Sequence, residues 1–213
     1  MATSNAPFII KICGIMCEED AREATAAGAN ALGFNFYPKS PRYITLERAR
    51  QIVQAAPDRY LKVGVFVNLS EGELLSAAAA VPLDVLQLHG ERCVIPSASP
   101  YRIWRSIPGG SAAPPPDDRI EAYLLDAPTS AYGGSGQPFN WSLAAGFPYG
   151  VIVAGGLDAT NVAAAIAAIQ PWGVDACSRL ERFPGRKDPD RVRAFVAAAT
   201  LASRNILPVE LKV

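Results

Sequence analysis

The sequence is poor in the features that build metal centres, disulfide frameworks and membrane spans. It has one histidine, His89, and four cysteines with no CxxC pair among them, so it offers no usual zinc motif and predicts reduced thiols. No uncharged apolar run approaches the ~20 residues that cross a bilayer. The first residues, MATSNAPF, lack the basic and apolar regions of a signal peptide. We therefore expect a cytoplasmic protein without a metal.

The sequence also lacks an excess of charge of either sign. Lys and Arg number 20, as do Asp and Glu, while hydrophobic residues make up 50% of the composition. A strongly basic surface for nucleic acid or for an anionic membrane is therefore not expected. The composition is typical of a soluble globular protein.

Short runs rich in Val, Ile and Leu alternate with Ala-rich amphipathic stretches, which is the pattern of βα units around a parallel sheet. These runs predict strands at residues 8–13, 31–36, 61–67, 83–89, 101–107, 121–126, 150–155 and 173–178. Eight units in a chain of this length predict an α/β fold, a single-domain (β/α)8 TIM barrel over residues 1–213. A doubly wound open sheet is the second architecture, which the absence of GxGxxG after the first strand disfavours.

Helices are expected between most of these strands, at residues 18–27, 46–55, 71–80, 159–169 and 190–202. Two connections fit this scheme poorly. ERCVIPSASP (91–100) has room for only about two helical turns before Pro96, and PGGSAAPPPDDR (108–119) has the composition of a loop. We therefore expect a loop in place of the helix after the fifth strand.

Alternation along the strands predicts which side chains enter the barrel. In the first strand Lys11 and Cys13 share a face with Ile9, opposite the apolar face that should meet the helices. Barrel enzymes keep their active sites at the carboxyl ends of the strands, where Cys13 lies. The same reasoning brings polar side chains of the fourth, sixth and eighth strands to this mouth: Gln87, His89, Asp126, Asp175 and Cys177.

Two stretches near the end of the chain suit an anion. VAGGLDATN (153–161) follows the seventh strand, and the backbone N–H groups of Gly155 and Gly156 can approach a ligand closely. DACSRLE (175–181) follows the eighth strand and contains the start of a short helix. Many barrels bind phosphate at this place.

The motifs KICGI (11–15), KSPRYI (39–44), QLHGE (87–91), LLDA (124–127), GVDACSRLE (173–181) and PGRKD (184–188) occur in an order that resembles the phosphoribosylanthranilate isomerase family. The resemblance extends over essentially the whole chain. It implies a barrel enzyme of tryptophan biosynthesis that acts on a phosphorylated small molecule without metal or cofactor. The implied reaction is an Amadori rearrangement, in which an aminoaldose becomes an aminoketose.

Carried over by motif, the resemblance implies that Cys13 is the general base that removes the sugar C2 proton, and that Asp126 is the general acid that protonates the ring oxygen. Arg42 resembles the residue that pairs with the anthranilate carboxylate. The other expected substrate-binding residues are Gln87, Asp175, Gly155, Gly156 and Ser178.

These roles carry expectations about protonation. Lys11 should lower the pKa of the Cys13 thiol, and burial should raise the pKa of Asp126 so that the acid keeps its proton. His89 suits a structural hydrogen bond better than acid–base work. The glycine-rich stretch TSAYGGSGQP (129–138) is typical of a mobile lid.

The chain departs from the family pattern after the eighth strand. Cys177, Ser178 and Arg179 stand where two serines and a glycine are usual. Two roles stay open for Arg179, a cationic contact to the phosphate or a side chain in solvent.

Two other functions remain open, namely a phosphate-binding barrel that has lost catalysis and a different barrel enzyme such as a carbon–carbon lyase or synthase. The latter needs a catalytic lysine or glutamate that the motifs do not place. Retention of both Cys13 and Asp126 favours the isomerase. The oligomeric state, monomer or homodimer, is also open.

Overall fold

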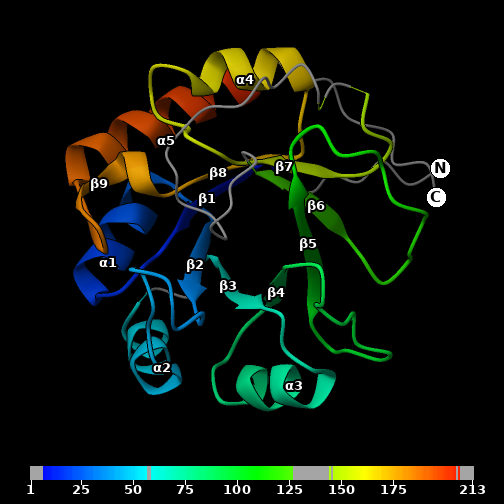
Figure 1. The fold of residues 1–213 in the computed structure, drawn as a ribbon. Coiled ribbons are helices and arrows are strands. Elements are labelled where there is room, and N and C mark those ends of the chain that lie inside the picture. The colour runs from blue at the N-terminus through cyan, green and yellow to red at the C-terminus, as the bar shows by residue number, and fades with distance from the viewer. Residues whose placement is uncertain (1–6, 57–58, 127–143, 145, 205, 207–213) are drawn as a thin grey trace.

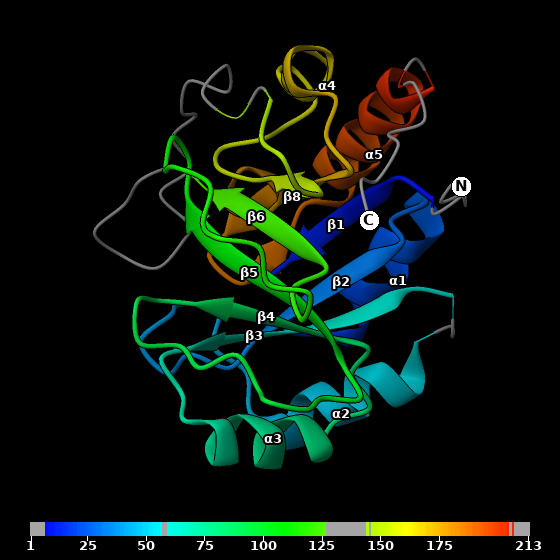
Figure 2. The same ribbon diagram turned by 90° about the vertical axis from the view of Figure 1, so that its right-hand side faces the viewer.

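The computed structural model describes residues 7–56, 59–126, 144, 146–204 and 206. Eight parallel strands close into a barrel in chain order (Figures 1 and 2), which confirms the predicted TIM barrel and rejects the open sheet. They are β1 (Ile9–Cys13), β2 (Ala31–Asn35), β3 (Leu61–Val67), β4 (Val85–His89), β5 (Arg102–Pro108), β6 (Ala122–Asp126), β7 (Val151–Val153) and β8 (Gly173–Ala176). Each coincides with a predicted strand to within a few residues at either end.

Helices lie on the outside of this barrel (Figure 1). They are α1 (Glu18–Ala27), α2 (Leu46–Ala55), α3 (Glu71–Ala79), α4 (Val162–Ile169) and α5 (Pro189–Ser203). The α3 helix begins with a capping box, in which the Ser70 side chain accepts from the Glu73 backbone and Glu73 accepts from the Ser70 backbone. The predicted bounds of α1 and α2 are confirmed, whereas α4 begins three residues later than predicted. The cause is a turn in which Asp158 N donates to Asn161 Oδ1 at 2.9 Å.

Neither the β4–β5 nor the β5–β6 connection contains a helix, so the predicted loop after the fifth strand is confirmed. Figure 2 shows β5 and β6 on the side of the barrel away from α1. An aromatic cluster covers the outer face of β6, where Tyr123 lies 5.6 Å from Phe147 and 5.2 Å from Tyr149 between ring centroids. The Tyr149 hydroxyl donates to the carbonyl of Pro114 at 2.9 Å and so ties the β5–β6 loop to this cluster.

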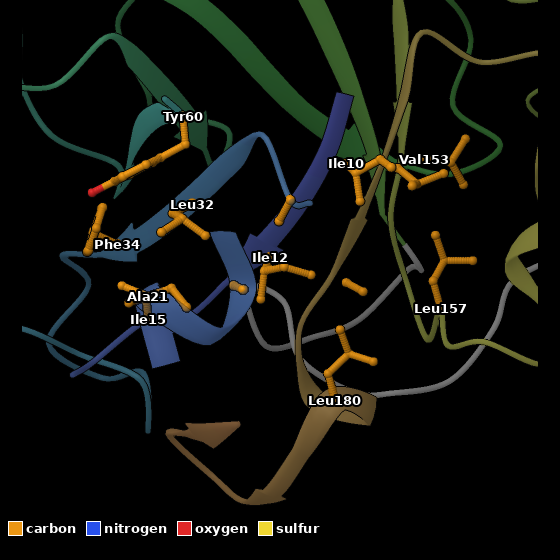
Figure 3. Packing of buried hydrophobic residues seen from close by; sticks show 14 of the residues in the cluster. Ile10, Ile12, Ile15, Ala21, Leu32, Phe34, Tyr60, Val153, Leu157 and Leu180 are labelled. Atoms are coloured by element: carbon orange, nitrogen blue, oxygen red, sulfur yellow. The ribbon is translucent and has the colours of Figure 1, made fainter. Parts of the chain in front are cut away.

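The core has two parts, as the alternation of side chains predicted. Ile10 and Ile12 of β1 lie with Leu32 of β2 and Ala21 of α1 in the cluster between barrel and helices (Figure 3). Ile9 belongs to a second cluster that fills the amino-terminal part of the barrel interior, together with Ala31, Val63, Val85, Trp104, Ala122, Leu124, Ile152 and Ala154. Apolar side chains therefore fill this part of the interior, and only the carboxyl end of the barrel has room for a ligand.

The segment after β8 contains the short helical turn that the sequence predicted and a strand pair that it did not. A 3₁₀ turn, η2 (Ser178–Leu180), leads into the antiparallel pair β9 (Glu181–Phe183) and β10 (Arg186–Lys187). The turn between them contains Gly185 at φ 86°, a left-handed conformation that glycine adopts without strain. Within the described residues, no helix is long and apolar enough to cross a membrane.

Candidate active site

A pocket opens at the carboxyl end of the barrel, where the sequence predicted an active site. Cys13 ends β1, Asp126 ends β6 and Arg42 reaches the pocket from the loop after β2. The other predicted residues on its wall are Gln87, His89, Asp175 and Cys177. The predicted convergence of strands one, four, six and eight on one mouth is therefore confirmed.

Lys11 and Asp175 form a buried ion pair one step below the mouth. They are register partners of the adjacent strands β1 and β8, and Lys11 Nζ donates to Asp175 Oδ1 at 2.9 Å. Burial lowers the pKa of Lys11, but the charges of Asp175 and Cys13 outweigh it and the net pKa is raised. Burial raises the pKa of Asp175 to about 7 against the opposing effect of Lys11. Lys11 is thus both a paired charge in the barrel and a cation beside Cys13.

The Cys13 thiol differs from the sequence expectation. Its pKa is raised well above the ordinary value, first by a hydrogen bond with Cys177 and then by burial, although Lys11 acts in the opposite direction. The predicted effect of Lys11 is confirmed in sign, but the predicted net lowering is wrong. The second sulfur, which the prediction left out, decides the outcome.

Cys177 carries the lowered pKa instead. The hydrogen bond from Cys13 brings the pKa of Cys177 to about 6 against the effect of burial, with the charges of Lys187 and Arg42 also favouring the thiolate. Its Sγ atom lies 3.7 Å from Lys187 Nζ and 3.9 Å from Glu181 Oε1. The β9–β10 pair thus places a buried cation and a buried carboxylate next to Cys177, behind the residues that line the pocket.

Arg42 is held by a carboxylate of the protein itself. Its Nε and Nη2 atoms donate to the two oxygens of Glu181 at 2.8 and 2.7 Å, a bidentate pair. Lys187 Nζ donates to the same carboxylate at 3.0 Å. All three side chains are more than nine-tenths buried. Within the described part of the chain, Nη1 is the Arg42 nitrogen without a protein acceptor.

Two glycines make room for these groups. A Cβ at Gly33 would lie 2.7 Å from Cys13 Sγ and 3.0 Å from Lys11 Nζ, and a Cβ at Gly14 would lie 2.8 Å from Arg42 Cδ and 3.0 Å from Cys177 Sγ. Gly14 also has φ 74°. Neither glycine was predicted from the sequence as part of the site, although a glycine inside a strand such as Gly33 is a recognised signal of close approach.

His89 is buried and paired with Gln87, with 2.6 Å between His89 Nε2 and Gln87 Nε2. Burial, together with the charges of Lys11 and Arg105, lowers the pKa of His89 to about 3. The imidazole is therefore neutral at physiological pH, which agrees with the predicted structural role. Gln87 Oε1 is buried and has no hydrogen-bond partner in the described structure.

The two predicted anion loops lie next to each other, and their predicted phosphate-binding residues Gly155, Gly156 and Ser178 are not among those that line this pocket. Gly155 and Gly156 follow β7 with φ 86° and 62°, the left-handed region that a side chain would strain. Ser178 begins η2 after β8. Arg179 Nη1 donates to Asp158 Oδ2 at 2.7 Å and joins the loops. The Arg179 side chain is partly exposed and paired with this protein carboxylate, and its role toward a phosphate stays a prediction.

Comparison with known proteins agrees with the motifs. The family model described as N-(5'phosphoribosyl)anthranilate (PRA) isomerase matches residues 10–198. The N-(5'-phosphoribosyl)anthranilate isomerase of Solibacter usitatus is 45% identical over 199 residues, which cover 92% of this chain and 98% of that protein. The chain belongs to the phosphoribosylanthranilate isomerase family.

Solved structures of this family share the fold. The phosphoribosylanthranilate isomerase of Thermotoga maritima has a TM-score of 0.80 at 36% identity, with 91% of this chain and 99% of that chain covered. A second family structure, with a TM-score of 0.74 at 32% identity and the same coverage, contains reduced 1-(o-carboxyphenylamino)-1-deoxyribulose 5-phosphate. Membership confirms the resemblance and assigns the chain to an isomerase of tryptophan biosynthesis.

The alternative of a carbon–carbon lyase or synthase of the same barrel type is not supported. It requires a catalytic lysine or glutamate, and the described residues that line the pocket include neither type. Lys11 and Glu181, the nearby candidates, are both buried in ion pairs. The described residues also contain no group of three or more His, Cys, Asp or Glu side chains arranged to hold a metal ion. The expected lid, TSAYGGSGQP, lies outside the described residues.

Proposed function

We propose that this member of the phosphoribosylanthranilate isomerase family catalyses the Amadori rearrangement of N-(5-phosphoribosyl)anthranilate, with Cys13 as general base and Asp126 as general acid. The observation that carries the proposal is the presence of Cys13 and Asp126 on the wall of one pocket, at the ends of β1 and β6. An acid and a base on different strands suit a reaction that needs a proton at one atom and removes a proton from another.

The rearrangement follows from these two groups. Asp126 gives its proton to the furanose ring oxygen, the bond from C1 to that oxygen breaks, and the nitrogen lone pair forms an iminium. Cys13 then takes the C2 proton as general base, and the C2–H electron pair forms the C1–C2 double bond and neutralises the nitrogen. Tautomerisation of this enolamine yields the aminoketose. Asp126 needs a raised pKa for the first step, which stays a prediction.

The remaining predicted residues supply binding. Arg42 lines the pocket and has Nη1 available for the anthranilate carboxylate. The unpartnered Oε1 of Gln87 suits a donor on the substrate, either its amine or a sugar hydroxyl. We assign the phosphate to the backbone of Gly155 and Gly156 and to Ser178, and a sugar hydroxyl to Asp175.

The setting of the enzyme is also part of the proposal. All four cysteines are free thiols, which suits a reducing compartment such as the cytoplasm. The partner is a phosphorylated small molecule rather than nucleic acid or membrane. The chain acts as a monomer or a homodimer, which sedimentation of the purified protein distinguishes.

The test is consumption of phosphoribosylanthranilate by the purified protein, followed as loss of anthranilate-type fluorescence. We expect turnover without added metal or cofactor. In parallel, calorimetry with a reduced, non-reactive product analogue measures binding. Binding without turnover would support the inactive phosphate-binding barrel, and absence of both would reject the substrate assignment.

A further inference from the structure

Two thiols meet in the active site, and the proposed reaction uses only one of them. Cys13 ends β1, and Cys177 directly follows β8, the neighbouring strand of the barrel. The last register pair between these strands is Ile12 with Ala176, so the two cysteines are the next residues along. Their side chains share a hydrogen bond, and both line the pocket.

The charges around the two sulfurs differ. Cys177 faces two cations, Arg42 from the loop after β2 and Lys187 from β10, and one carboxylate, Glu181 from β9. Glu181 is itself engaged by both cations. The protein groups around Cys177 therefore carry a surplus of one positive charge, which a thiolate neutralises.

Cys13 lacks a cation of this kind. Lys11 is shared with Asp175 at 2.9 Å, and the charge of Arg42 acts on both sulfurs. Lys187 is therefore the cation that distinguishes Cys177 from Cys13. Asp126, the other carboxylate that lines the pocket, is also an acidic group and cannot stabilise a thiolate on Cys13. A single negative charge shared by the two sulfurs is thus more stable on Cys177 than on Cys13.

We propose that Cys177 is a positioning residue for Cys13, holding the negative charge of the resting pair and accepting the Cys13 proton, so that the two sulfurs act as one base. The inference rests on the proposed function. In a single step the C2–H bond breaks as an S–H bond forms on Cys13, while the former S–H bond of Cys13 breaks and an S–H bond forms on the Cys177 thiolate. The pair then holds two protons until one is released.

The shared proton predicts how activity depends on pH. The pair becomes competent when it loses its first proton, which the low pKa of Cys177, about 6, places below neutrality. Without Cys177, Cys13 must ionise alone, opposed by burial and favoured by the charges of Lys11 and Arg42. A thiol with an ordinary pKa of about 8.5 is only ~3% ionised at pH 7, so the loss there should be about 30-fold or more.

The experiment compares the pH profiles of kcat/KM for wild type, Cys177→Ser and a matched control, Cys93→Ser, in the presence of a thiol reductant. Cys93 is a partly buried thiol on the β4–β5 connection. For wild type and Cys93→Ser we expect kcat/KM to fall on the acidic side with a midpoint near pH 6. For Cys177→Ser this midpoint should lie two or more pH units higher. The kcat/KM values of the three proteins should converge at high pH. Superimposable profiles would overturn the inference, because a packing role does not move the midpoint.

A second measurement does not depend on activity. The ultraviolet absorbance of thiolates, titrated in wild type and in Cys177→Ser, should show one group ionising near pH 6 in wild type that the variant lacks. If no thiolate forms below pH 8 in wild type, the inference is wrong. If wild type and Cys93→Ser are both inactive, the proposed function fails, and the absorbance titration still decides whether the two sulfurs share a charge.

Discussion

At the scale of single residues, Arg42 has one side bound to the protein and the other open to the pocket. Its Nε and Nη2 atoms hold Glu181, so the guanidinium is fixed in place before any ligand arrives. A fixed cation loses little freedom when it binds a carboxylate, which makes it an effective anchor.

Replacement of Arg42 by lysine should therefore raise KM for phosphoribosylanthranilate by about tenfold or more, with a smaller effect on kcat, because an ammonium group cannot hold Glu181 bidentately and also reach the substrate. Steady-state kinetics of the variant measure this split. Arg48→Lys, on the surface of α2, is the matched control. An unchanged KM in Arg42→Lys would place the carboxylate elsewhere.

The roles of single residues were predictable where they depend on one strand. Alternation along β1 and β4 correctly placed Cys13 and Gln87 in the mouth, since the period of a strand is fixed by its geometry. The protonation of Cys13 was not predictable, because it depends on Cys177 and, through it, on Lys187. No local pattern encodes contacts between residues so distant in the sequence.

At the scale of elements, aromatic side chains cover the outer face of β6, although the β5–β6 connection contains no helix. Tyr123 is 3% exposed, and the rings of Phe147 and Tyr149 pack against it with centroid separations between 5.2 and 5.6 Å. These aromatic contacts exclude water from the outer face of a strand that delivers Asp126 to the site.

Removal of this cover should destabilise the fold. Tyr123→Ala should lower the free energy of unfolding by about 3 kcal/mol, the usual cost of deleting a buried aromatic ring. Tyr149→Phe, which removes only the hydrogen bond to Pro114, should cost about 1 kcal/mol. Urea unfolding measures both. A loss below ~1 kcal/mol for Tyr123→Ala would show that the cluster contributes little.

Element boundaries followed from the sequence where local signals are strong. The Ser70 capping box marks the start of α3, and the Pro-rich composition of 108–119 correctly predicted a loop. The β9–β10 pair was missed, although Pro184-Gly185 is a turn signal, because its strands are too short to show alternation. That omission also hid Glu181 and Lys187.

At the scale of the whole molecule, His89 links stability to pH. The pKa of His89 is about 3 in the folded protein, whereas an unfolded histidine titrates near 6.5. Below pH 6.5 the unfolded chain therefore binds a proton that the folded chain does not, and folding loses stability as the pH falls. Asp175, with its raised pKa, acts in the opposite direction at similar pH and masks this slope.

Comparison of wild type with His89→Gln isolates the effect, because Asp175 is common to both. Between roughly pH 6 and 4, wild type should lose about 1.4 kcal/mol of unfolding free energy per pH unit relative to the variant. Above pH 7 the difference should be constant. Urea unfolding across this range gives the slope, and a difference independent of pH would mean that His89 is protonated in the folded state.

The central claim is that Cys13 and Asp126 perform the rearrangement, and the most direct test is the turnover of phosphoribosylanthranilate by Cys13→Ser and Asp126→Asn. Cys93→Ser serves as the control, and binding of the reduced product analogue shows that each variant is folded. We predict a loss of kcat of about 100-fold or more in both variants, the usual contribution of a general acid or base, with analogue binding retained. Near wild-type turnover in either variant would contradict the assignment.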